Sequence, residues 1–579
     1  MKKRNTVVID LVQIAEYLIL LSKVHHEYET ELPSRRMSAV AAAAARYSSS
    51  LRAASWNLAA VNNNPFEYWI TMEDPAYGKM LADVEALVQA PGAADVPIGT
   101  IFTDQMFDEL AACFEARGWG EHAGAIVEAW AGFKDRPVVS GFLKDGELSK
   151  KRLTSMPDRT TNTLATTAGP AFRPTVINCF EGKMDSVEEW WGHWKRFMFE
   201  DAMEMTPGVN KVGADLLAPI KRSKYPALTE AEEAICMPLQ TLCLALFDAV
   251  QLHVVRTVAP DTWQTMRNQI ADALNRHKKP ITARVLANPA YDDTEVWFLQ
   301  ECQAAFIETE LKNVGGNGTV ASLAERYNAV GPQRLSKANQ NSALLLSKER
   351  FDLTTLKDLT ASANAAMTAR DEGGENKGEM NKNKKSAVSD GDLLLVAVSE
   401  KGEEGAERFA FCSFHGDTNG LATIPVLRSV VAAVKQEEAE TGVSHTLVCG
   451  MDANVYANAS NPKPGKKQGC AEFGAAAVSL GLTTATGDDS DQSITTSASA
   501  RTFLQPQLQK AVTAAEIAAH ADTHPKDHIL FPKGRFPGTE GMMRDNTGEG
   551  RYEAGIVLLP TLAFPSDHCL VRAHLKSAL

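Results

Sequence analysis

At 579 residues the chain is too long for one compact core, so we expect two or more modules. Its apolar content of 44% and charged content of 23% are ordinary for a globular protein. The net charge of −13 argues against a large DNA-coating surface of clustered lysine and arginine. This net charge does not exclude a nuclease, because the cleft of a nuclease needs only local positive charge and a metal ion.

The first 49 residues precede the predicted fold. The run from Met1 to Val24 begins with Lys-Lys-Arg, but Asp10 and Glu16 interrupt its apolar stretch, so neither a secretory signal nor a membrane span fits. We expect an amphipathic helix and a flexible lead-in at residues 1–49, and no transmembrane segment.

The nine cysteines indicate the compartment. They show no CxxC pair and no metal-type spacing, and several lie inside apolar runs, as buried free thiols do. This favours a reducing, intracellular location, either cytoplasmic or nuclear. An organelle stays open, because residues 33–66 contain no acid and are rich in alanine, serine and arginine.

The first part of the chain combines one strand with a long helical stretch. Residues 50–70 contain a predicted strand that ends near Asn57, followed by a loop at Asn62–Pro65. Residues 71–288 show helical periodicity broken at proline and glycine, with helices expected at 80–90, 107–117, 187–203, 228–255 and 261–277, which predicts a mainly α-helical module. Its Trp190–Trp194 cluster is interpreted as helix-packing core, with a ligand site as the alternative.

Strand character returns in residues 289–579. Apolar runs bounded by turns predict strands at 294–302, 342–351, 392–398, 408–415, 446–449, 527–531 and 566–575, with helices at 424–438 and 471–481. Residues 371–388 are polar, contain glycine and carry almost no apolar anchor, which predicts a disordered loop.

The stretch Thr446–Tyr456 organises this second part. An apolar, β-branched run breaks at Gly450 and is followed by Asp452 and Asn454. On an extended chain, side chains two residues apart point to the same face, so this carboxylate and amide would lie side by side. That pair could activate a water molecule against phosphorus; an Asx turn after a core strand is the alternative.

Polar residues stand at six predicted strand ends although the strand pattern does not require them. They are Trp56-Asn57, Gln300-Glu301, Phe414-His415, Gly450-Met451-Asp452-Ala453-Asn454, Asp527-His528-Ile529 and Ser566-Asp567-His568. Each alone fits a turn, an exposed strand end or a satisfied buried histidine. Together, and in this order, they resemble the motifs of the endonuclease/exonuclease/phosphatase superfamily, whose members are deoxyribonuclease I-like. The resemblance covers about residues 50–70 and 290–579 and does not extend to the insertion.

The resemblance implies an α/β fold: a four-layer sandwich of two packed mixed β-sheets flanked by helices. The active site would lie at the end where the strand termini gather. Met451 separates Gly450 from Asp452, where the family motif has no residue, so the turn there is expected to be slightly rebuilt. The helical module would project from the first connection and shape substrate access or bind a protein partner.

The resemblance also implies a metal site. Glu301 would be the main ligand, with Asn57 and Asp567 assisting directly or through water. Hard oxygen ligands without thiolates suit Mg²⁺, for which Mn²⁺ could substitute.

Acid–base roles follow from the same resemblance. Asp452 would accept a proton from the attacking water, and Asn454 would orient that water or the phosphate. His568 would donate to a phosphate oxygen while Asp527 holds its tautomer. His415 would lie on the opposite side, against the phosphate or the leaving group.

Some further residues are candidates for substrate contact. Arg501 and Lys510 lie in the loop before the Asp527 strand and could meet a phosphate, although a solvated face explains them as well. Asn419 follows His415 and could line the cleft, or belong to a tight turn. Asn62–Asn64 and Glu67 follow the first strand closely and are expected to border the site.

These observations predict a Mg²⁺-dependent phosphoesterase that hydrolyses a phosphodiester, first of all a nuclease acting on DNA or RNA. The substrate is chosen by analogy, since one fold supports many chemistries. A phosphoinositide phosphatase or a sphingomyelinase-like phosphodiesterase is the alternative within enzymes. A catalytically silent scaffold, binding a partner through its helical module, is the alternative outside them.

Overall fold

The structure is a computed structural model that describes residues 50–311, 319–335, 340–373, 388–402, 406–457, 465–486, 493–506, 511–555 and 558–577. The predicted N-terminal helix and lead-in lie outside this part, as does Lys510. Most of the predicted loop at 371–388 also lies outside it. Residues 371–373 are helical, forming the end of α15 (Thr360–Gly373), which corrects the start of that predicted loop.

The first six-stranded sheet has the order β15-β16-β1-β6-β8-β7. β1 and β6 are parallel, and every other neighbouring pair is antiparallel, so the sheet is mixed. The helical stretch between β1 and β6 therefore connects two adjacent parallel strands, a connection that has to cross over the sheet. The bounds are β1 Leu51–Asn57, β6 Val296–Cys302, β7 Tyr327–Val330, β8 Asn341–Ser347, β15 Met543–Asp545 and β16 Leu570–Leu575.

The second six-stranded sheet has the order β13-β14-β12-β11-β10-β9. It too contains one parallel pair, β11 with β12, among antiparallel neighbours. The bounds are β9 Phe351–Asp358, β10 Leu393–Glu400, β11 Arg408–His415, β12 Thr446–Asp452, β13 Leu482–Thr484 and β14 Asp527–Pro532.

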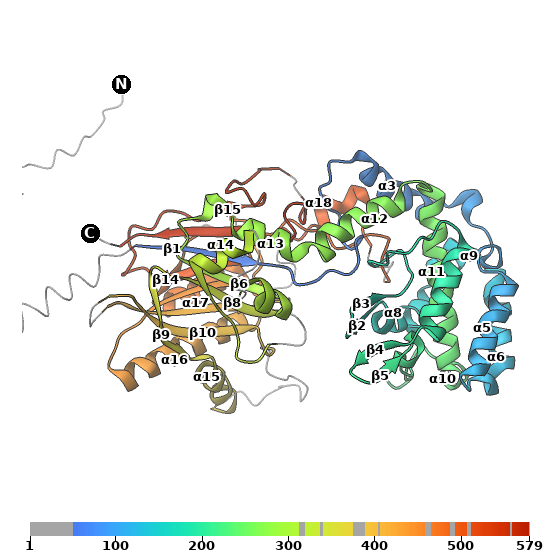
Figure 1. The fold of residues 1–579 in the computed structure, drawn as a ribbon, viewed down its shortest axis with the longest axis horizontal. Helices are drawn as coiled ribbons and strands as arrows, with labels where there is room; N and C mark the ends of the chain where they lie inside the picture. Colours follow the sequence, from blue (N-terminus) through green and yellow to red (C-terminus); the bar gives the residue numbers. More distant parts are fainter. Residues whose placement is uncertain are drawn as a thin grey trace, which may run out of the picture.

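Three apolar layers hold the sandwich together. Side chains from both sheets, among them Phe298 and Phe411, form the core between them. The outer face of the first sheet packs on α13 (Lys278–Leu286) and α14 (Thr319–Arg326). The outer face of the second packs on α15, α16 (Thr423–Thr441) and α17 (Cys470–Ser479). The predicted four-layer α/β sandwich is confirmed (Figure 1).

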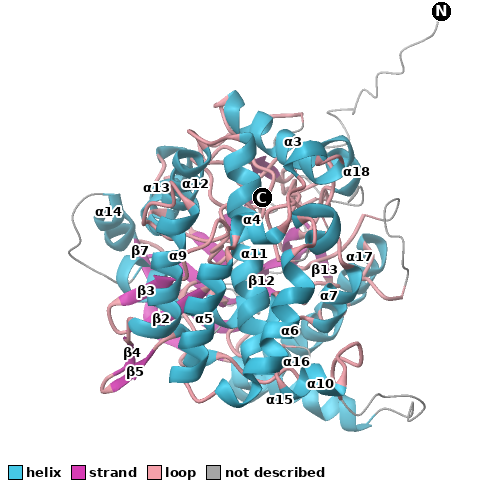
Figure 2. Ribbon diagram, turned by 90° about the vertical axis from the view of Figure 1, so that its right-hand side faces the viewer, coloured by secondary structure: helices cyan, strands magenta, loops and turns pink. Residues whose placement is uncertain are grey.

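Beside the sandwich lies a mainly helical module with its own core, made almost entirely of residues 66–274 (Figures 1 and 2). Its helices are α3 Pro75–Gln89, α4 Ile98–Ile101, α5 Asp104–Ala116, α6 Ala123–Lys134, α7 Gly146–Lys151, α8 Ser155–Thr161, α9 Val187–Lys195, α10 Glu230–Ala234, α11 Cys236–Val258 and α12 Trp263–Ala271. Two hairpins join them: β2 Thr163–Thr166 with β3 Gly169–Phe172, and β4 Met203–Thr206 with β5 Val209–Lys211.

The helix α11 is the centre of this module. Among the described residues it is the one helix long and apolar enough to cross a membrane, yet 78% of its apolar window is buried inside the protein. A helix that is apolar on every side is expected where other helices surround it. Trp190, Trp191 and Trp194 of α9 are buried in the same core and contact one another, as predicted for helix packing.

Several predicted bounds differ from the structure. The helix expected over 187–203 ends at Lys195, continues as a π-turn to Glu200, and gives way to the hairpin β4–β5. The short strands β7, β13 and β15 are present without having been predicted, because three or four residues carry too little periodicity to identify a strand. The eight-residue strand β9 was not predicted either. Helix α13, within the predicted 71–288 insertion, packs on the first sheet of the sandwich.

Candidate active site

The register of the second sheet places three of the predicted residues in one row. His415 ends β11 opposite Asp452, which ends β12, and Asp452 is in turn opposite Asp527, which begins β14. In the first sheet, Asn57 at the end of β1 is paired with Gln300 of β6. The Asn57 amide nitrogen donates to Asp452 Oδ2 at 2.9 Å, so the ends of the two sheets meet at this point.

Around Asp452 the first group of side chains contains Glu301, His415 and Asn57. His415 Nε2 lies 3.3 Å from Glu301 Oε1 and 3.8 Å from Asp452 Oδ2. Asn57 Nδ2 donates to Glu301 Oε1 at 3.1 Å as well as to Asp452, while its oxygen accepts from the Ala59 backbone N–H. The amide therefore bridges the two carboxylates.

A second group lies on the other side of Asp452. His568 Nδ1 lies 2.9 Å from Asp527 Oδ2, and His568 Nε2 lies 3.7 Å from Asp452 Oδ2. Burial opposes the charged imidazole, but Asp527 and Asp452 outweigh it and raise the pKa of His568 well above its ordinary value. At neutral pH the ring is an imidazolium, with Nδ1 facing Asp527 and Nε2 facing Asp452.

Asn454 adopts a strained backbone conformation at the end of β12. Its φ is +48°, and its side chain donates to the Gly416 carbonyl at 2.8 Å, while its backbone N–H donates to Asp452 Oδ1 at 2.9 Å. Asp452 and Asn454 do lie together, but not because side chains alternate along a strand, as the sequence predicted. The strand ends at Asp452, and a turn makes the contact. Glu301 also has a positive φ, +51°. Such strain persists only where surrounding contacts enforce it, and it is common at functional sites.

Buried hydrogen bonds hold these strand ends in place. Gln300 Nε2 donates across the sandwich to Ser413 Oγ at 3.1 Å and to the Gly450 carbonyl at 3.2 Å. Ser566 Oγ donates to the Asn57 carbonyl at 2.6 Å and accepts from the His568 backbone N–H at 3.1 Å. Gln300 and Ser566 thus hold the backbone of the strand ends in place, while the catalytic candidates next to them in the sequence face the site.

Neighbouring charges favour the ionised forms of both Asp452 and His415. Burial disfavours an ionised Asp452, but the nearby His568 and His415 outweigh it and hold the pKa of that carboxyl below its ordinary value. Burial likewise disfavours the His415 imidazolium, yet Asp392, Glu301 and Asp452 raise its pKa to about 9. Asp452 is therefore a carboxylate at neutral pH, as a proton acceptor must be.

Sequence reasoning missed two buried lysines at the site. Lys278 and Lys526 are 4% and 5% exposed. Lys278 Nζ donates to the Ala59 carbonyl at 2.6 Å, and Lys526 Nζ lies 2.6 Å from Asp522 Oδ2. Burial lowers the pKa of Lys278 to about 8, although the charges of Asp567 and Glu301 oppose the shift. Lys278 and Lys526 thus place positive charge beside the acidic residues of the site. Neither lies in a motif, so only the fold identifies them.

Asp567 lies at the same site, but its carboxylate is not among the atoms that converge on Asp452. Burial raises its pKa, and the charge of Glu301 adds to the shift while His568 opposes it. Among the described residues, two groups have ligand atoms within 4.8 Å of one another: Glu301, His415 and Asp452, and Asp452, Asp527 and His568. Asp567 belongs to neither.

The first of these groups fits a divalent cation. It contains two carboxylates and no thiolate, and carboxylate oxygens are the donors that Mg²⁺ or Mn²⁺ prefers. Asn57 presents its amide nitrogen to both carboxylates, so it holds them rather than offering an oxygen ligand in this arrangement. Glu301 and Asp452 are therefore the residues best placed to hold such an ion.

Arg501 and Asn419, two of the predicted substrate contacts, lie outside the groups around Asp452. Arg501 is exposed, and its carbonyl accepts from Trp69 Nε1. Asn419 is exposed on the turn after His415, where its backbone N–H lies within hydrogen-bonding distance of Asp417 and its carbonyl accepts from the Gln468 backbone N–H. The alternatives of a solvated face for Arg501 and a turn for Asn419 account for these positions.

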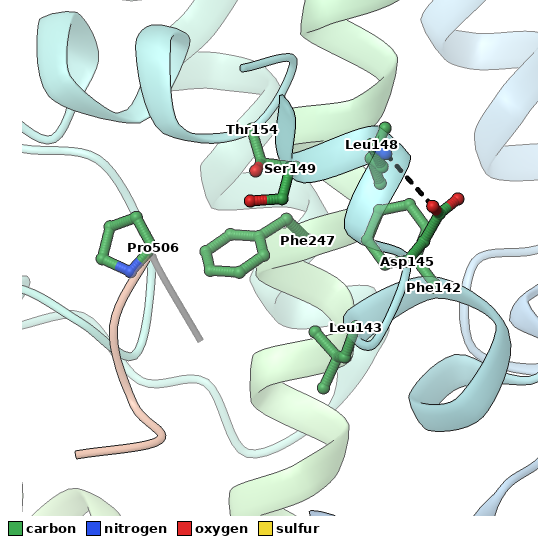
Figure 3. Close-up of a pocket in the computed structure, with 8 residues that line it drawn as sticks. All are labelled: Phe142, Leu143, Asp145, Leu148, Ser149, Thr154, Phe247 and Pro506. Carbon is green, nitrogen blue, oxygen red and sulfur yellow. Dashed lines mark hydrogen bonds between the residues drawn. The ribbon is translucent and has the colours of Figure 1, made fainter. Parts of the chain in front are cut away.

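A separate pocket inside the helical module offers little chemistry. Phe142, Leu143, Leu148 and Phe247 dominate its lining, and Pro506 approaches Phe247 from another segment (Figure 3). Asp145, its charged residue, is engaged in accepting from the Leu148 backbone N–H and in an ion pair with Arg136. The reactive groups lie instead at the strand ends.

Comparison with known proteins gives one family match and several structural ones. Residues 95–268, within the helical module, match a family model described as a domain of unknown function (DUF8234). No curated protein matches the chain in sequence.

Solved structures similar to the chain include TDP2 from Caenorhabditis elegans, at 12% identity and a TM-score of 0.30 over 52% of this chain and 93% of that one. The endonuclease domain of the retrotransposon TRAS1 has 11% identity and a TM-score of 0.29, covering 52% and 94%. An endonuclease/exonuclease/phosphatase family protein from Bacteroides thetaiotaomicron has 14% identity and a TM-score of 0.28, covering 52% and 89%. These values do not support an inference about activity, which has to come from the site.

Proposed function

We propose that the protein is a metal-dependent phosphoesterase that cleaves a phosphodiester bond, with nucleic acid as the substrate. The observation that carries the proposal is the convergence of Asp452 with two flanking groups, Glu301–His415 and Asp527–His568, where the two sheets meet. The six sequence motifs each contribute a residue to this place or to the hydrogen bonds that hold it.

Asp452 is the residue suited to accept the proton of an attacking water molecule. It is buried and ionised at neutral pH, and its Oδ1 and Oδ2 are oriented by the Asn454 N–H and the Asn57 amide. A fixed carboxylate of this kind contributes about 10²- to 10⁴-fold to rate as a general base.

His568 and His415 are suited to stabilise negative charge on the phosphoryl oxygens. Asp527 occupies Nδ1 of His568, so Nε2 is the nitrogen that faces Asp452 and the space beside it. His415 faces the same carboxylate from the opposite side. Imidazolium groups flanking a nucleophilic water provide electrostatic stabilisation where charge develops.

Glu301 would be the main residue to hold Mg²⁺, which neutralises phosphoryl charge and stabilises the leaving oxygen. The buried lysines Lys278 and Lys526 support the same proposal, because they add positive charge beside the acidic cluster without occupying the ligand positions.

The test is Mg²⁺-dependent hydrolysis by the full chain beside two isosteric variants, Glu301→Gln and Asp452→Asn. The panel holds plasmid DNA, single-stranded DNA, polyadenylate RNA, a phosphoinositide and sphingomyelin. We expect cleavage of a nucleic acid that requires the metal and falls at least about 100-fold in each variant. Glu310→Gln, a matched change on the turn Phe306–Leu311, should retain activity.

Other outcomes assign other functions. Metal-dependent turnover of the phosphoinositide or sphingomyelin alone would replace nucleic acid as the substrate class. No turnover on any substrate, together with no Mg²⁺ binding by calorimetry, would overturn the proposal in favour of a silent scaffold.

A further inference from the structure

A second cavity lies where the helical module meets the segment that follows β1. It has a volume of about 310 Å³, which is in the range of small-molecule sites. Asn62, Asn63 and Glu67 come from the segment after β1, Asn162 and Ile177 from the helical module, and Gln505 from the loop before β14. The module therefore builds one wall of the cavity.

The cavity lies next to the candidate active site. Val61 at the cavity rim is four positions after Asn57, and at about 3.5 Å a position this chain spans no more than roughly 14 Å. Burial raises the pKa of Glu67, and the charge of Asp567 adds to the shift, so the two carboxylates are close enough to interact. A ligand whose phosphate lies at Asp452 could extend a neighbouring group into this cavity.

The polar groups that line the cavity are both donors and acceptors. The side-chain oxygens of Asn62 and Asn63 accept from the Asn64 backbone N–H and the Asn275 amide, and their amide nitrogens donate to no described residue. The Glu67 carboxylate accepts no side-chain or backbone hydrogen bond from the described part of the chain. Two free N–H₂ groups and a free carboxylate suit a ligand edge that mixes acceptors and donors.

Some residue types are missing from the described lining, and this limits the classes of ligand that can bind. None of the described residues around the cavity is lysine or arginine, so this part of the lining offers a second phosphate no cation. None is aromatic, so a quaternary ammonium headgroup has no aromatic cage. Ile177 and Pro506 offer apolar contact of the kind that a flat ring needs.

We infer that this cavity binds the nucleoside adjoining the scissile phosphate and that the helical module acts in substrate selection. Glu67 accepts a hydrogen bond from an N–H group of the base or a sugar hydroxyl, and the amides of Asn62 and Asn63 donate to base acceptors. This inference rests on the proposed phosphodiesterase function and names the part of the substrate that the module recognises.

The test compares two chromogenic diesters with the full chain in Mg²⁺: thymidine 5′-(p-nitrophenyl phosphate), which carries a nucleoside, and bis(p-nitrophenyl) phosphate, which does not. The readout is the ratio of their kcat/KM values, because a general effect on the metal site cancels in it. Glu67→Gln and Val61→Trp, which fills the cavity from its 37%-exposed rim, should each lower the ratio about tenfold or more. Glu73→Gln, an exposed carboxylate outside the cavity, should leave it at the wild-type value.

Calorimetric binding of thymidine monophosphate, with inositol monophosphate as the comparison, separates the two proposals. Binding that is lost in Glu67→Gln, without hydrolysis of either diester, would keep the cavity inference and overturn the phosphoesterase. Hydrolysis of both diesters at a ratio that neither variant changes would overturn the cavity inference and keep the enzyme. Tighter binding of the inositol phosphate would overturn the nucleoside assignment, and neither binding nor hydrolysis would overturn both proposals.

Discussion

The charges of the site are set by single residues that are buried together. His568 is the clearest case, since burial alone would leave it neutral and its carboxylate partners reverse that. Asp527 is itself buried, and burial raises its pKa while His568 lowers it. The two residues therefore depend on each other for their ionisation, and replacing one changes the titration of the other.

Asp527→Asn removes this support. The pKa of His568 should fall, so the imidazolium is lost at a lower pH and the alkaline limb of kcat/KM moves to lower pH. We expect kcat to fall about 100-fold or more, the cost of a mispositioned acid–base group. The measurement is a pH–rate profile, with the His568 titration followed by NMR.

Asp545→Asn is the control, because Asp545 is a buried carboxylate that contacts Tyr291 away from the site. It should leave the alkaline limb where it is in the wild type. An Asp527→Asn profile that coincides with wild type would contradict the assigned role of the pair.

At the scale of elements, β12 is continuous where a break was predicted. It runs from Thr446 to Asp452 without a register irregularity against β11 or β14, so Met451 lengthens the strand and is buried on its helix-facing side. Gly450 is required for a different reason than a turn: a Cβ there would lie 2.3 Å from the Cβ and Cγ of Phe298 in the facing sheet. The close approach of the two sheets depends on this glycine.

Gly450→Ala should therefore destabilise the sandwich by about 1–3 kcal/mol, the usual cost of overpacking a core. Thermal and urea unfolding measure the change. Gly474→Ala in α17, where a Cβ meets nothing within 4 Å, is the matched control and should be neutral or slightly stabilising. A Gly450→Ala protein as stable as wild type would contradict the contact.

The strand β14 carries an acid-sensitive histidine on the face opposite the site. His528 is buried against Phe473, its Nε2 lies 2.7 Å from the Pro525 carbonyl, and its Nδ1 has no hydrogen-bond partner among the described residues. Burial lowers its pKa to about 4. A proton on Nδ1 would place an uncompensated charge among apolar groups.

The stability effect follows from this depressed pKa. Above about pH 6.5 neither the folded nor the unfolded state protonates His528; below it the unfolded state takes up the proton first, so folded stability is lost as pH falls toward 4. For a depression of this size the loss approaches about 3 kcal/mol. His528→Gln should lose less stability than wild type between pH 7 and pH 4.5 in urea unfolding. Equal losses in the two proteins would contradict a neutral buried imidazole.

At the scale of the whole molecule, two cores lie side by side (Figure 1). Inside the helical module, Arg173 ion-pairs with Asp248 at 2.8 Å and with Asp158 at 2.6 Å, and the Arg173 and Asp248 side chains are fully buried. Trp194 Nε1 also donates to Asp248. This network joins α8, α9 and α11 around the guanidinium group of Arg173. Asp158, a member of the network, also lines the proposed nucleoside cavity.

Arg173→Met should leave Asp248 buried without compensation, at a cost of about 3–5 kcal/mol. We expect calorimetry to show the helical module unfolding at a lower temperature than the sandwich, as a separate transition. Arg196→Met breaks an exposed ion pair with Asp201 and should change stability by less than about 1 kcal/mol. A single transition lowered as a whole would show that the two cores unfold together.

The sequence by itself determined the α/β class, the helical stretch and the residues at the strand ends. Apolar runs of seven or eight residues, such as β6 and β11, have periodicity strong enough to identify, and the polar residues that end them stand out against it. The short strands of three or four residues carry no such signal.

Only the tertiary structure decided what each polar group contacts. Lys278 reaches the Ala59 carbonyl across a sequence separation of 219 residues, and His568 reaches Asp527 across 41, so no local pattern encodes either distance. The same holds for the Asp452–Asn454 turn, for the glycine that Phe298 requires, and for the cavity shared with the helical module. Local sequence sets the elements, whereas packing between distant segments sets the charges, strain and cavities that make a site.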